Sequence, residues 1–412
     1  MEGAPVSRLK PLIERICAEV GPRPSGTPEE AQAARLLKAE LEPLADSVVI
    51  EELSFHRGVL PGHFTLISLA YGAALMLYFP VPWLASLLVA VSLAVHVLYY
   101  HLSLHVVDFL FPRATTQNVI ARLEPSGETR RTVLFSGHHD SAVYAPLFQP
   151  PWQRWLPWLY AGLLFSMVWL VLLGVGRTLA QGQALRLGSG QALRLGSGQA
   201  WDWWVVADWT LLVPILGFLL SVILRVGIFT NKPILGANDN LSSVAVAVGV
   251  LRALRERGWR PEHIAVWAVS FGAEEAGKEG SETFARLHAE ELREGFAINM
   301  ETVGAGYELV VWEKEPGVRF APEAVALVER AAARVGIQIR RSAPLFGDSD
   351  AACLMRGSIA ATTVTRENEV GGYPLWHALE DTPANQDEKR LQEVLRLCLA
   401  VVEELELSMT ND

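Results

Sequence analysis

Three long stretches of the sequence are almost free of charged side chains. Residues 59–112 contain one Asp, Glu, Lys or Arg, Asp108, and residues 155–176 contain none. Residues 203–224 contain only Asp208. A helix needs about 20 mostly apolar residues to cross the hydrocarbon core of a bilayer. The stretches therefore predict four transmembrane helices, at about 62–79, 83–106, 155–176 and 203–225.

The residues in and beside these stretches also indicate that the stretches lie in a lipid bilayer. Most of the 13 tryptophans lie in or beside them, many near their ends, as in the aromatic belts at membrane interfaces. Pro80 and Pro82 separate the first two helices, because a helix cannot continue through two closely spaced prolines. Buried helices of a large soluble core are the alternative, and the length of the uncharged runs disfavours it.

Charge and cysteine content exclude other classes. The formal net charge is −10, so the chain lacks the basic character expected of a nucleic-acid-binding protein. The three cysteines, Cys17, Cys353 and Cys398, are far apart in sequence, which argues against a disulfide scaffold and against a cysteine zinc site. The first ten residues contain no apolar core, so we expect no secretory signal peptide.

The remaining sequence predicts a water-soluble α/β domain that is interrupted twice. Thr27-Pro28-Glu29-Glu30 is a capping box that opens a helix to about Leu41. Strand-like segments alternate with helical ones, which favours a mostly parallel sheet flanked by helices. The predicted strands are 47–55, 117–123, 132–136, 264–271, 296–300, 309–312 and 359–364, and the other predicted helices are 242–257, 322–335 and 386–407.

The predicted domain organisation follows from these patterns. Residues 1–57, 114–149 and 233–412 form one discontinuous domain, and residues 58–113 and 150–232 are inserted transmembrane hairpins. Within the second insertion, residues 183–198 are two tandem copies of QALRLGSG, and their Gly and Ser residues indicate a linker between two spans. A short helix at the membrane surface is the alternative for this repeat.

Five short segments place His, Asp or Glu at the ends of predicted strands or in nearby loops. In an open α/β sheet, ligands bind beyond the carboxyl ends of the strands, so these segments can converge on one edge. Each segment alone has an ordinary structural explanation, such as a helix cap or a solvated acidic pair. The segments are Gly137–Ser141, Gly236–Asn240, Gly272–Gly277, Asn299–Glu301 and Trp376–Thr382.

The residue types in these segments suit a zinc centre. Imidazole nitrogens and carboxylate oxygens are zinc ligands, and a carboxylate can bridge two ions that activate one water. A carboxylate that binds no metal can act as the base towards that water. In the His-x-Asp segment, Asp140 can accept the second ring N–H of His138 and so fix its tautomer.

At this level the sequence resembles the co-catalytic zinc aminopeptidases, the clan that includes bacterial leucyl aminopeptidase, glutamate carboxypeptidase and the endoplasmic-reticulum metallopeptidases. The segment Gly21–Thr27 also resembles the opening segment of that family. The resemblance covers residues 1–57, 114–149 and 233–412 and omits both insertions. It implies two zinc ions, with Glu274 as general base and Asp140 as the partner of His138. It also implies the metal ligands, His138 and Glu301 for one ion, Glu275 and His377 for the other, and Asp239 as the bridge.

Several points stay open at the sequence level. Many family members have Asp where this chain has Glu301, although the endoplasmic-reticulum relatives use Glu. His139 could replace His138, but the His-x-Asp spacing favours His138. The segment Phe346–Asp350 either lines the substrate pocket or caps the next helix. His101, His105 and Asp108, spaced i, i+4 and i+7, are expected to form a polar helix face rather than a metal site.

The resemblance implies an exopeptidase-like hydrolase that acts on peptides. Water activated between the metals would lose its proton to Glu274 and attack the scissile carbonyl, and Glu274 would then protonate the leaving amine. One rival is a glutaminyl cyclase-like zinc acyl transferase, to which Trp376 beside His377 points. The other rival is a non-catalytic receptor or scaffold of the same fold, and such relatives usually lack the ligands that this chain retains.

The sequence also predicts a multi-pass membrane protein with its catalytic domain in the cytoplasm. Each insertion holds an even number of spans, so all pieces of the soluble domain lie on one side of the membrane. The positive-inside rule favours the cytoplasm for that side. The flanking cations there are Arg57, Arg113, Arg154, Arg225 and Lys232, against Arg177, Arg186 and Arg194 on the other side.

Overall fold

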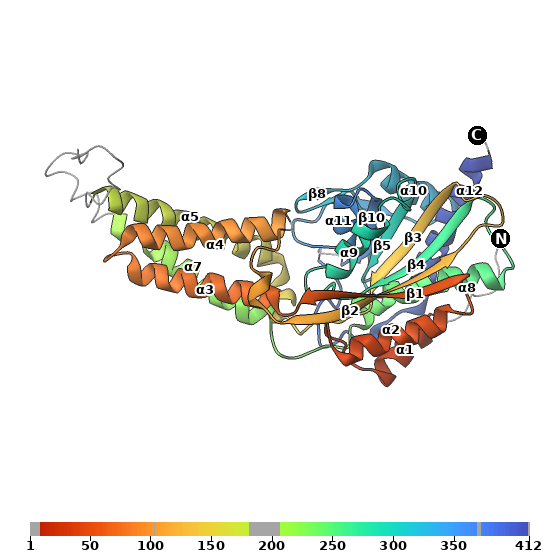
Figure 1. Ribbon diagram of the computed structural model, residues 1–412, viewed down its shortest axis with the longest axis horizontal. Coiled ribbons are helices and arrows are strands. Elements are labelled where there is room, and N and C mark those ends of the chain that lie inside the picture. Colours follow the sequence, from red (N-terminus) through yellow and green to blue (C-terminus); the bar gives the residue numbers. More distant parts are fainter. Residues whose placement is uncertain (1–8, 103, 181–206, 369–371, 411–412) are drawn as a thin grey trace. The chain divides into compact units, whose positions relative to one another are not determined.

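The computed structural model describes residues 9–102, 104–180, 207–368 and 372–410, and these residues divide into two compact units (Figure 1). Unit 1 comprises Met1–Arg57, Pro112–Arg154 and Thr230–Asp412, and unit 2 comprises Gly58–Phe111 and Trp155–Phe229. The QALRLGSG repeat, which we interpret as a linker, lies outside the described residues.

Unit 1 is built around a mixed, mostly parallel sheet, as the sequence predicts. Its eight strands have the order β1-β2-β4-β3-β5-β10-β6-β9. The pairs β4–β3, β3–β5, β5–β10 and β6–β9 are parallel. The strands are β1 (Ser47–His56), β2 (Arg113–Leu123), β3 (Arg131–His138), β4 (Ile264–Phe271), β5 (Phe296–Glu301), β6 (Glu308–Trp312), β9 (Arg340–Ser342) and β10 (Ala360–Glu367), and a small separate ladder joins β7 (Lys314–Glu315) and β8 (Val318–Arg319).

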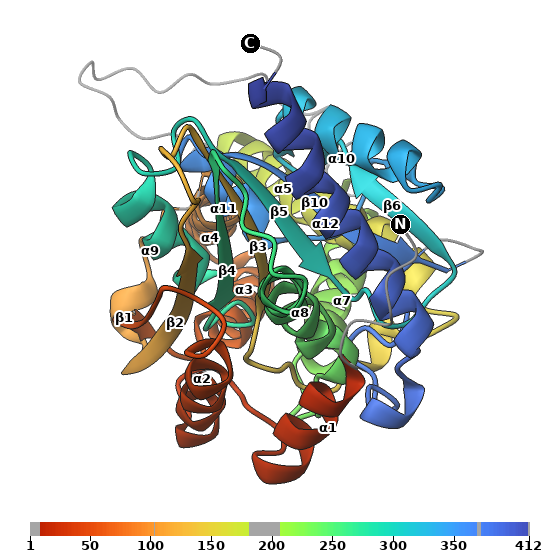
Figure 2. The ribbon, with the colours of Figure 1, turned by 90° about the vertical axis from the view of Figure 1, so that its right-hand side faces the viewer.

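Helices cover both faces of this sheet (Figure 2). One face carries α2 (Pro28–Leu41), α8 (Ser242–Glu256), α10 (Pro322–Arg334) and α12 (Glu388–Thr410), with α1 (Lys10–Glu19) packed on α8. The other face carries α9 (Glu279–His288) and α11 (Asp350–Arg356). The predicted helices match α2, α8, α10 and α12, whereas α1, α9 and α11 are not among the helices predicted from the sequence.

The central strands have the sequence character that their position demands. All eight residues of β4 are buried, because β2 and β3 pair with its two edges and helices cover both faces of the sheet. β4 consequently reads as a continuous apolar run, IAVWAVSF, rather than an alternating one. The edge strand β1 instead alternates between exposed and partly buried residues over its first half. The position of each strand in the sheet therefore accounts for its hydrophobic pattern.

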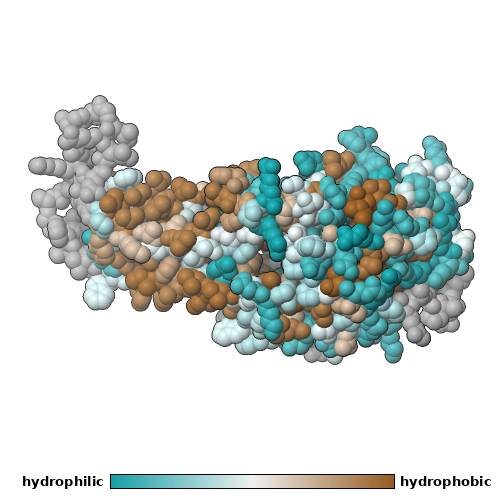
Figure 3. Space-filling model, turned by 60° about the horizontal axis from the view of Figure 1, so that its bottom comes forward, coloured by the Kyte–Doolittle hydropathy of each residue, from teal (hydrophilic) through white to brown (hydrophobic). Residues whose placement is uncertain are grey.

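Unit 2 is a bundle of four apolar helices, α3 (Val59–Leu77), α4 (Pro82–Leu102), α5 (Leu156–Ala180) and α7 (Leu212–Ile228). Each helix packs on two others, in the cyclic order α3-α4-α5-α7. Among the described residues, four helices are long and apolar enough to cross a membrane, at Val59–Leu77, Pro82–Tyr99, Gln153–Leu179 and Ala207–Ile228. Apolar side chains gather on the outer surfaces of these helices in Figure 3.

Polar side chains inside the bundle are paired between helices. His63 Nε2 lies 3.0 Å from His96 Nδ1, and the other ring nitrogen of His96 contacts the Tyr160 hydroxyl. Asp208 accepts hydrogen bonds from Arg177 at 2.7 and 2.8 Å and from the Tyr78 hydroxyl at 3.0 Å. An unpaired polar group is costly wherever water is excluded, and these pairs satisfy the polar groups between the apolar helices.

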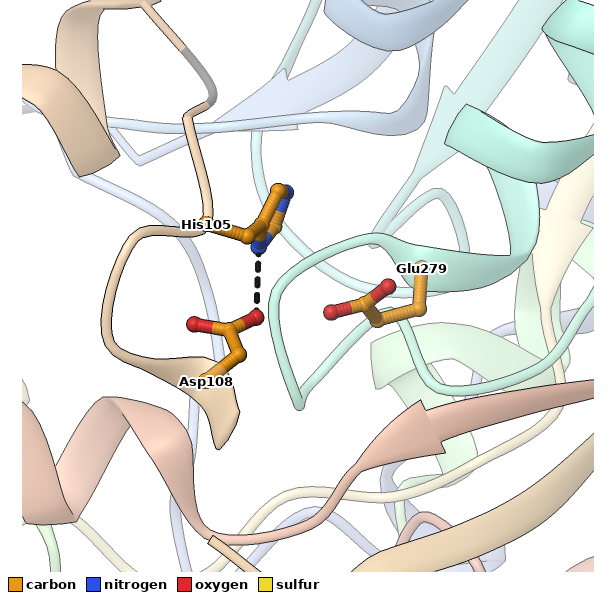
Figure 4. Close-up of side chains that lie close together, drawn as sticks. All are labelled: His105, Asp108 and Glu279. Carbon is orange, nitrogen blue, oxygen red and sulfur yellow. Dashed lines mark hydrogen bonds and ion pairs between the residues drawn. The ribbon is translucent and has the colours of Figure 1, made fainter. Parts of the chain in front are cut away.

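One expectation about this unit is wrong. The sequence suggests that His101, His105 and Asp108 share a helical face, but α4 ends at Leu102 and Asp108 begins a separate short 3₁₀-helix. His105 Nδ1 instead bonds Asp108 Oδ2 across a loop at 2.7 Å (Figure 4). Glu279, which Figure 4 also draws, belongs to unit 1.

The packing of α9 on β4 gives a test of the core of unit 1. Phe284 is fully buried and contacts Phe271 and His288, with ring centroids 5.3 and 4.5 Å apart. Phe284→Ala should destabilise unit 1 by about 3–5 kcal/mol, the usual cost of such a cavity. The measurement is the denaturant midpoint of the detergent-solubilised protein. Leu287→Ala on the same helix is the control, because Leu287 is 61% exposed, and equal shifts in the two variants would contradict this packing.

Candidate metal centre

Three parallel strands deliver predicted site residues to one edge of the sheet. His138 is the last residue of β3, Glu301 is the last residue of β5, and Glu274 and Glu275 follow the end of β4. In the ladder His138 is opposite Phe271 of β4, and Ser136 is opposite Asn299 of β5. His138 and Glu301 each lie two residues beyond the Ser136–Asn299 pair that joins β3 and β5, so both are at the same carboxyl edge.

The other two predicted ligands come from irregular segments. Asp239 lies in the π-helical turn Ala237–Leu241 that precedes α8, where its own φ of −112° and ψ of 85° are not helical. His377 lies in a loop and has a positive φ of 49°. Asp239 is 4% exposed, and the side chain of His377 is 15% exposed. Both side chains are thus held inside the unit by backbone conformations that regular helices and strands do not provide.

Asp239 faces both histidines with its two oxygens. Its Oδ1 lies 3.3 Å from His138 Nε2, and its Oδ2 lies 3.7 Å from His377 Nε2. On one side, Glu301 Oε2 is 3.6 Å from His138 Nε2. On the other side, Glu275 Oε2 is 3.2 Å from His377 Nε2. The five side chains thus form two groups of three that share Asp239, and in each group the candidate ligand atoms lie within 4.8 Å of one another.

Glu274 lies beside the first group, and two amides orient Glu301. Glu274 Oε2 is 3.7 Å from His138 Nε2. Asn240 Nδ2 donates to Glu301 Oε2 at 2.6 Å, and Asn299 Nδ2 donates to Glu301 Oε1 at 2.9 Å. Both donors are neutral, so they fix the position of the Glu301 carboxylate without cancelling its charge.

The electrostatics of the cluster reflect an excess of buried acids. Burial raises the pKa of Glu274 well above its usual range, and burial also raises the pKa values of Glu275 and Glu301. Burial alone would lower the pKa of His138, but the carboxylates around it, Glu274 foremost, raise that pKa well above its usual range. Burial likewise opposes the rise in the pKa of His377, which Glu275 causes. The site therefore favours the binding of further positive charge.

Asp140 connects the first histidine to the loop that follows β4. Its Oδ1 accepts the Glu274 N–H at 3.2 Å, and its Oδ2 accepts the Glu275 N–H at 3.1 Å and the Ser25 hydroxyl at 2.7 Å. The same Oδ1 lies 3.3 Å from His138 Nδ1. Asp140 thus contacts both the predicted ligand His138 and the segment that carries the predicted base. Burial alone would raise the pKa of the Asp140 carboxyl, but its contacts, His138 foremost, outweigh burial and lower that pKa.

The geometry separates His138 from its neighbour His139. The His139 ring lies on the other side of the strand, where its Nδ1 bonds the Ser270 hydroxyl at 2.9 Å. Burial lowers the pKa of His139 to about 4, so its ring is neutral at physiological pH. His139 is therefore placed as a core residue, and His138 is the one directed into the acidic cluster.

Two further buried acids, Asp381 and Glu30, support this site, and neither is among the site residues predicted from the sequence. Asp381 accepts the Asn238 N–H at 2.5 Å and the Asp239 N–H at 3.1 Å, and burial raises its pKa to about 8. Glu30 accepts the Ala273 N–H at 2.9 Å and the Gly26 N–H at 2.7 Å, and burial raises its pKa to about 8.

Glu30 could have been found from the capping box. In a full box its carboxylate would bond the backbone of Thr27, whereas here it bonds Gly26 and the loop after β4. The Thr27 hydroxyl does accept the Glu30 N–H at 3.3 Å, so half of the box forms. Asp381 follows His377 in a segment that the sequence singles out, but nothing local indicates which amides it binds.

The segment Phe346–Asp350 lies at the start of α11. Ser349 is the N-cap residue but makes no capping hydrogen bond, and its hydroxyl instead donates to Glu315 at 2.7 Å. Asp350 is fully buried, and burial raises its pKa to about 7, with Glu301 adding to the rise and His138 opposing it. The side chain of Ser349 therefore does not cap α11, which argues against capping as the role of this segment. Asp350 interacts electrostatically with His138 and Glu301 of the candidate metal site.

The donor set fits zinc. Imidazole nitrogen and carboxylate oxygen are both zinc ligands, and each group of three leaves room in a four-coordinate shell for water or substrate. Asp239 Oδ2 is buried and has no hydrogen-bond partner among the described residues, which is the state expected of an atom that is available to a metal. The cluster thus combines unsatisfied ligand atoms with an excess of negative charge.

The comparisons with known proteins agree with this arrangement. Residues 222–402 match the family described as Peptidase family M28. No curated protein is similar enough in sequence to be matched. Among solved structures, a zinc aminopeptidase from Bacillus subtilis is 14% identical, with 97% of this chain and 94% of that chain covered and a TM-score of 0.55. A Zn-dependent exopeptidase from Parabacteroides distasonis is also 14% identical, with 96% of each chain covered and a TM-score of 0.56.

A glutaminyl cyclase from Bacteroides thetaiotaomicron, bound to N-acetylhistamine, is similar to the same degree. It is 15% identical, with 96% of each chain covered and a TM-score of 0.56. The fold is therefore that of the zinc exopeptidases and glutaminyl cyclases. The family match and the fold confirm the resemblance to a co-catalytic zinc aminopeptidase-like family, and the match to a peptidase family supports a hydrolase.

The contrast between the two adjacent histidines gives a direct test of the site. His138→Gln should lower the zinc content of the purified protein, because the imidazole that faces Asp239 and Glu301 is lost. His139→Gln is the matched control and should retain the zinc, because that ring bonds Ser270. Zinc per chain is measured by mass spectrometry of the metal after dialysis. Loss of zinc in the control with retention in His138→Gln would reverse the assignment.

Proposed function

We propose that this chain is a membrane-anchored aminopeptidase with two zinc ions, and that it hydrolyses the N-terminal bond of peptides. The observation that carries the proposal is the position of Asp239, whose two oxygens lie 3.3 and 3.7 Å from the two histidines. A carboxylate between two sets of ligands is the arrangement that a pair of metal ions needs. The match to a peptidase family supports hydrolysis as the reaction.

In this proposal five side chains hold the metals. His138 and Glu301 hold one ion, Glu275 and His377 hold the other, and Asp239 is shared between them. Zinc in such a site lowers the pKa of a water and polarises a carbonyl group. Asp140 keeps His138 oriented through its Nδ1 side, and a partner of this kind typically improves metal affinity by about 10–100-fold.

Glu274 is the proposed general base. Its carboxylate is available for proton transfer because it lies beside the first group, 3.7 Å from His138 Nε2, and outside the set of five ligands. Burial raises the pKa of Glu274, and a raised pKa suits a group that takes a proton from water and then passes it to the leaving amine. The backbone N–H of Glu274 is held by Asp140, so the base is positioned by the same acid that orients His138.

Aromatic side chains beside His377 offer a surface for an apolar substrate side chain. Trp376 stacks on Phe148 with ring centroids 4.0 Å apart, and Tyr373 meets Trp376 edge to face at 5.1 Å. Phe148 also lies 5.0 Å from the His377 ring. Because this cluster adjoins a proposed ligand, we infer a preference for peptides with apolar or aromatic N-terminal residues.

Replacement of the base tests the mechanism. Glu274→Gln should retain the zinc of the wild-type protein, because Glu274 is not among the five proposed ligands. Its kcat for an aminoacyl substrate should fall by about 10²–10⁴-fold or more, the usual contribution of a general base. Glu380→Gln is the control, since Glu380 is exposed on the loop that carries His377. Wild-type turnover in Glu274→Gln would overturn this assignment.

A glutaminyl cyclase-like activity is the second candidate. The stacked Trp376 beside His377 and the cyclase folds among the neighbours favour it. The products separate the two activities, because an aminopeptidase releases a free amino acid whereas cyclisation of N-terminal Gln releases ammonia. Ammonia release from a Gln-peptide without free amino acid would select the cyclase.

We also propose that unit 2 anchors the enzyme in a lipid bilayer with unit 1 on the cytoplasmic side. The apolar helices and the excess of flanking cations at the chain's entry and exit points support this orientation. A fluorescent reporter fused after Asp412 should mature in the cytoplasm, whereas a periplasmic phosphatase fused at the same point should stay inactive. The control places the same reporters within residues 183–198, where the opposite pattern is expected. A phosphatase that is active after Asp412 would reverse the orientation.

A further inference from the structure

Arg23 makes an unusual set of contacts that the proposed chemistry does not use. Its side chain is fully buried, and its guanidinium donates hydrogen bonds to four backbone carbonyls. Nε donates to His139 O at 2.7 Å, Nη1 donates to Gly21 O and Leu235 O at 2.8 Å each, and Nη2 donates to Gly236 O at 3.1 Å. One buried cation therefore joins three separate segments of the chain.

Two of these segments carry proposed metal-holding residues. His139 is the residue after His138, and Leu235 and Gly236 directly precede the turn that carries Asp239. In sequence the two segments are separated by the whole of α5 and α7. Fixing two chain segments that are so far apart in sequence costs conformational entropy, so the spacing between His138 and Asp239 must be maintained by contacts inside unit 1.

Other hydrogen bonds also join the two segments that carry His138 and Asp239, and among these contacts Arg23 binds the residues closest in sequence to those two ligands. Ile234 N donates to Ala142 O at 3.1 Å, and Tyr144 N donates to Lys232 O at 2.7 Å. These bonds form a short antiparallel neck where the chain leaves unit 1 and returns to it. Ser141 extends the neck towards Arg23, since its hydroxyl donates to Ile234 O at 3.0 Å and accepts the Arg23 N–H at 2.8 Å.

The local backbone is adapted to this cation. Gly236 has a φ of +59°, and a Cβ at this position would lie 3.1 Å from Arg23 Nη2 and 2.6 Å from Asp239 O. Any larger residue would therefore push the guanidinium away or displace the turn that carries Asp239. A lysine at position 23 would also be a poor substitute, because its ammonium is a single point charge without the planar fork that reaches several acceptors at once.

We propose that Arg23 is a positioning residue that sets the spacing between His138 and Asp239 by binding the backbone of both segments. This inference rests on the proposed function only in that His138 and Asp239 hold a metal. Arg23 acts through the backbone and touches no reacting group. Its effect is therefore expected on metal affinity and on local backbone protection, with the fold of unit 1 retained.

Hydrogen exchange of the metal-free protein is the first test. In Arg23→Met, peptides that cover 139–145 and 234–240 should exchange faster than in the wild type, while peptides from β5 and α12 keep their protection. Arg23→Lys should show a smaller change in the same peptides, because one ammonium can replace part of the hydrogen bonding. Arg15→Met is the matched control, since Arg15 is exposed on α1 and its protection pattern should match the wild type.

Zinc affinity, measured by competition with a chelator, is the second test. The dissociation constant should rise by about 10–100-fold in Arg23→Met, the size of effect seen when a supporting contact of a metal site is lost. Unchanged exchange in both peptides would overturn the proposal, and so would a uniform rise across unit 1, which would indicate a role in global folding. Wild-type behaviour of Arg23→Lys would show that charge alone suffices and would also overturn it.

These outcomes are distinct from a failure of the proposed function. Neither measurement uses a substrate, so the absence of aminopeptidase activity would leave both results valid. If the wild-type protein bound no zinc, the metal centre would be disproved, whereas the exchange experiment on metal-free protein would still decide the role of Arg23.

Discussion

The buried acids at the carboxyl edge of the sheet are the constraint on which the site depends. Asp239, Glu274, Glu275 and Glu301 approach one another around His138 and His377, and Asp239 and Glu301 are less than a tenth exposed. Burial raises the pKa values of the three glutamates, and the neighbouring carboxylates add to the rise because like charges repel strongly where water is excluded. Such a cluster is stable only with cations, whether protons or metal ions, and its nitrogen and oxygen donors suit zinc.

Buried carboxylates around the cluster accept hydrogen bonds from the backbone amides of the segments that carry the proposed ligands. Asp140 binds the N–H groups of Glu274 and Glu275, and Asp381 binds those of Asn238 and Asp239. In each case a buried carboxylate that is not a proposed ligand holds the segment that carries one. This arrangement fixes the loops that present the ligands, as a preorganised metal site requires, and it leaves Asp239 Oδ2 without a hydrogen-bond partner among the described residues.

Much of this could be predicted from the sequence, for reasons that differ between elements. The strand at 264–271 is predicted to the residue, because a central strand that is buried on both faces is a continuous apolar run with clear ends. The helix of Pro28–Leu41 is equally well defined by its N-cap and proline. His138, Glu274, Glu275 and Glu301 can be predicted to lie together because they end or follow strands whose carboxyl ends share one edge. Asp239 and His377 lie in irregular segments, so strand positions alone do not bring them to that edge.

The rest could not be predicted because it depends on contacts between segments that are distant in sequence. Helix α1 has no acidic first turn and no basic last turn to mark its ends. The role of Arg23 depends on carbonyl groups at positions 139, 235 and 236, and any residue type could supply them. The spacing of His105 and Asp108 is helical, but the chain between them is a loop, so the sequence pattern predicts a helix face that does not form.

The central claim is that the acidic cluster is a two-metal centre in which Asp239 is shared. Anomalous diffraction at the zinc absorption edge from crystals of the zinc-loaded protein tests it most directly. The account predicts two anomalous peaks, one beside His138 and Glu301 and the other beside Glu275 and His377, with Asp239 between them. A single peak, or a peak beside any other group of residues in place of these, would contradict it.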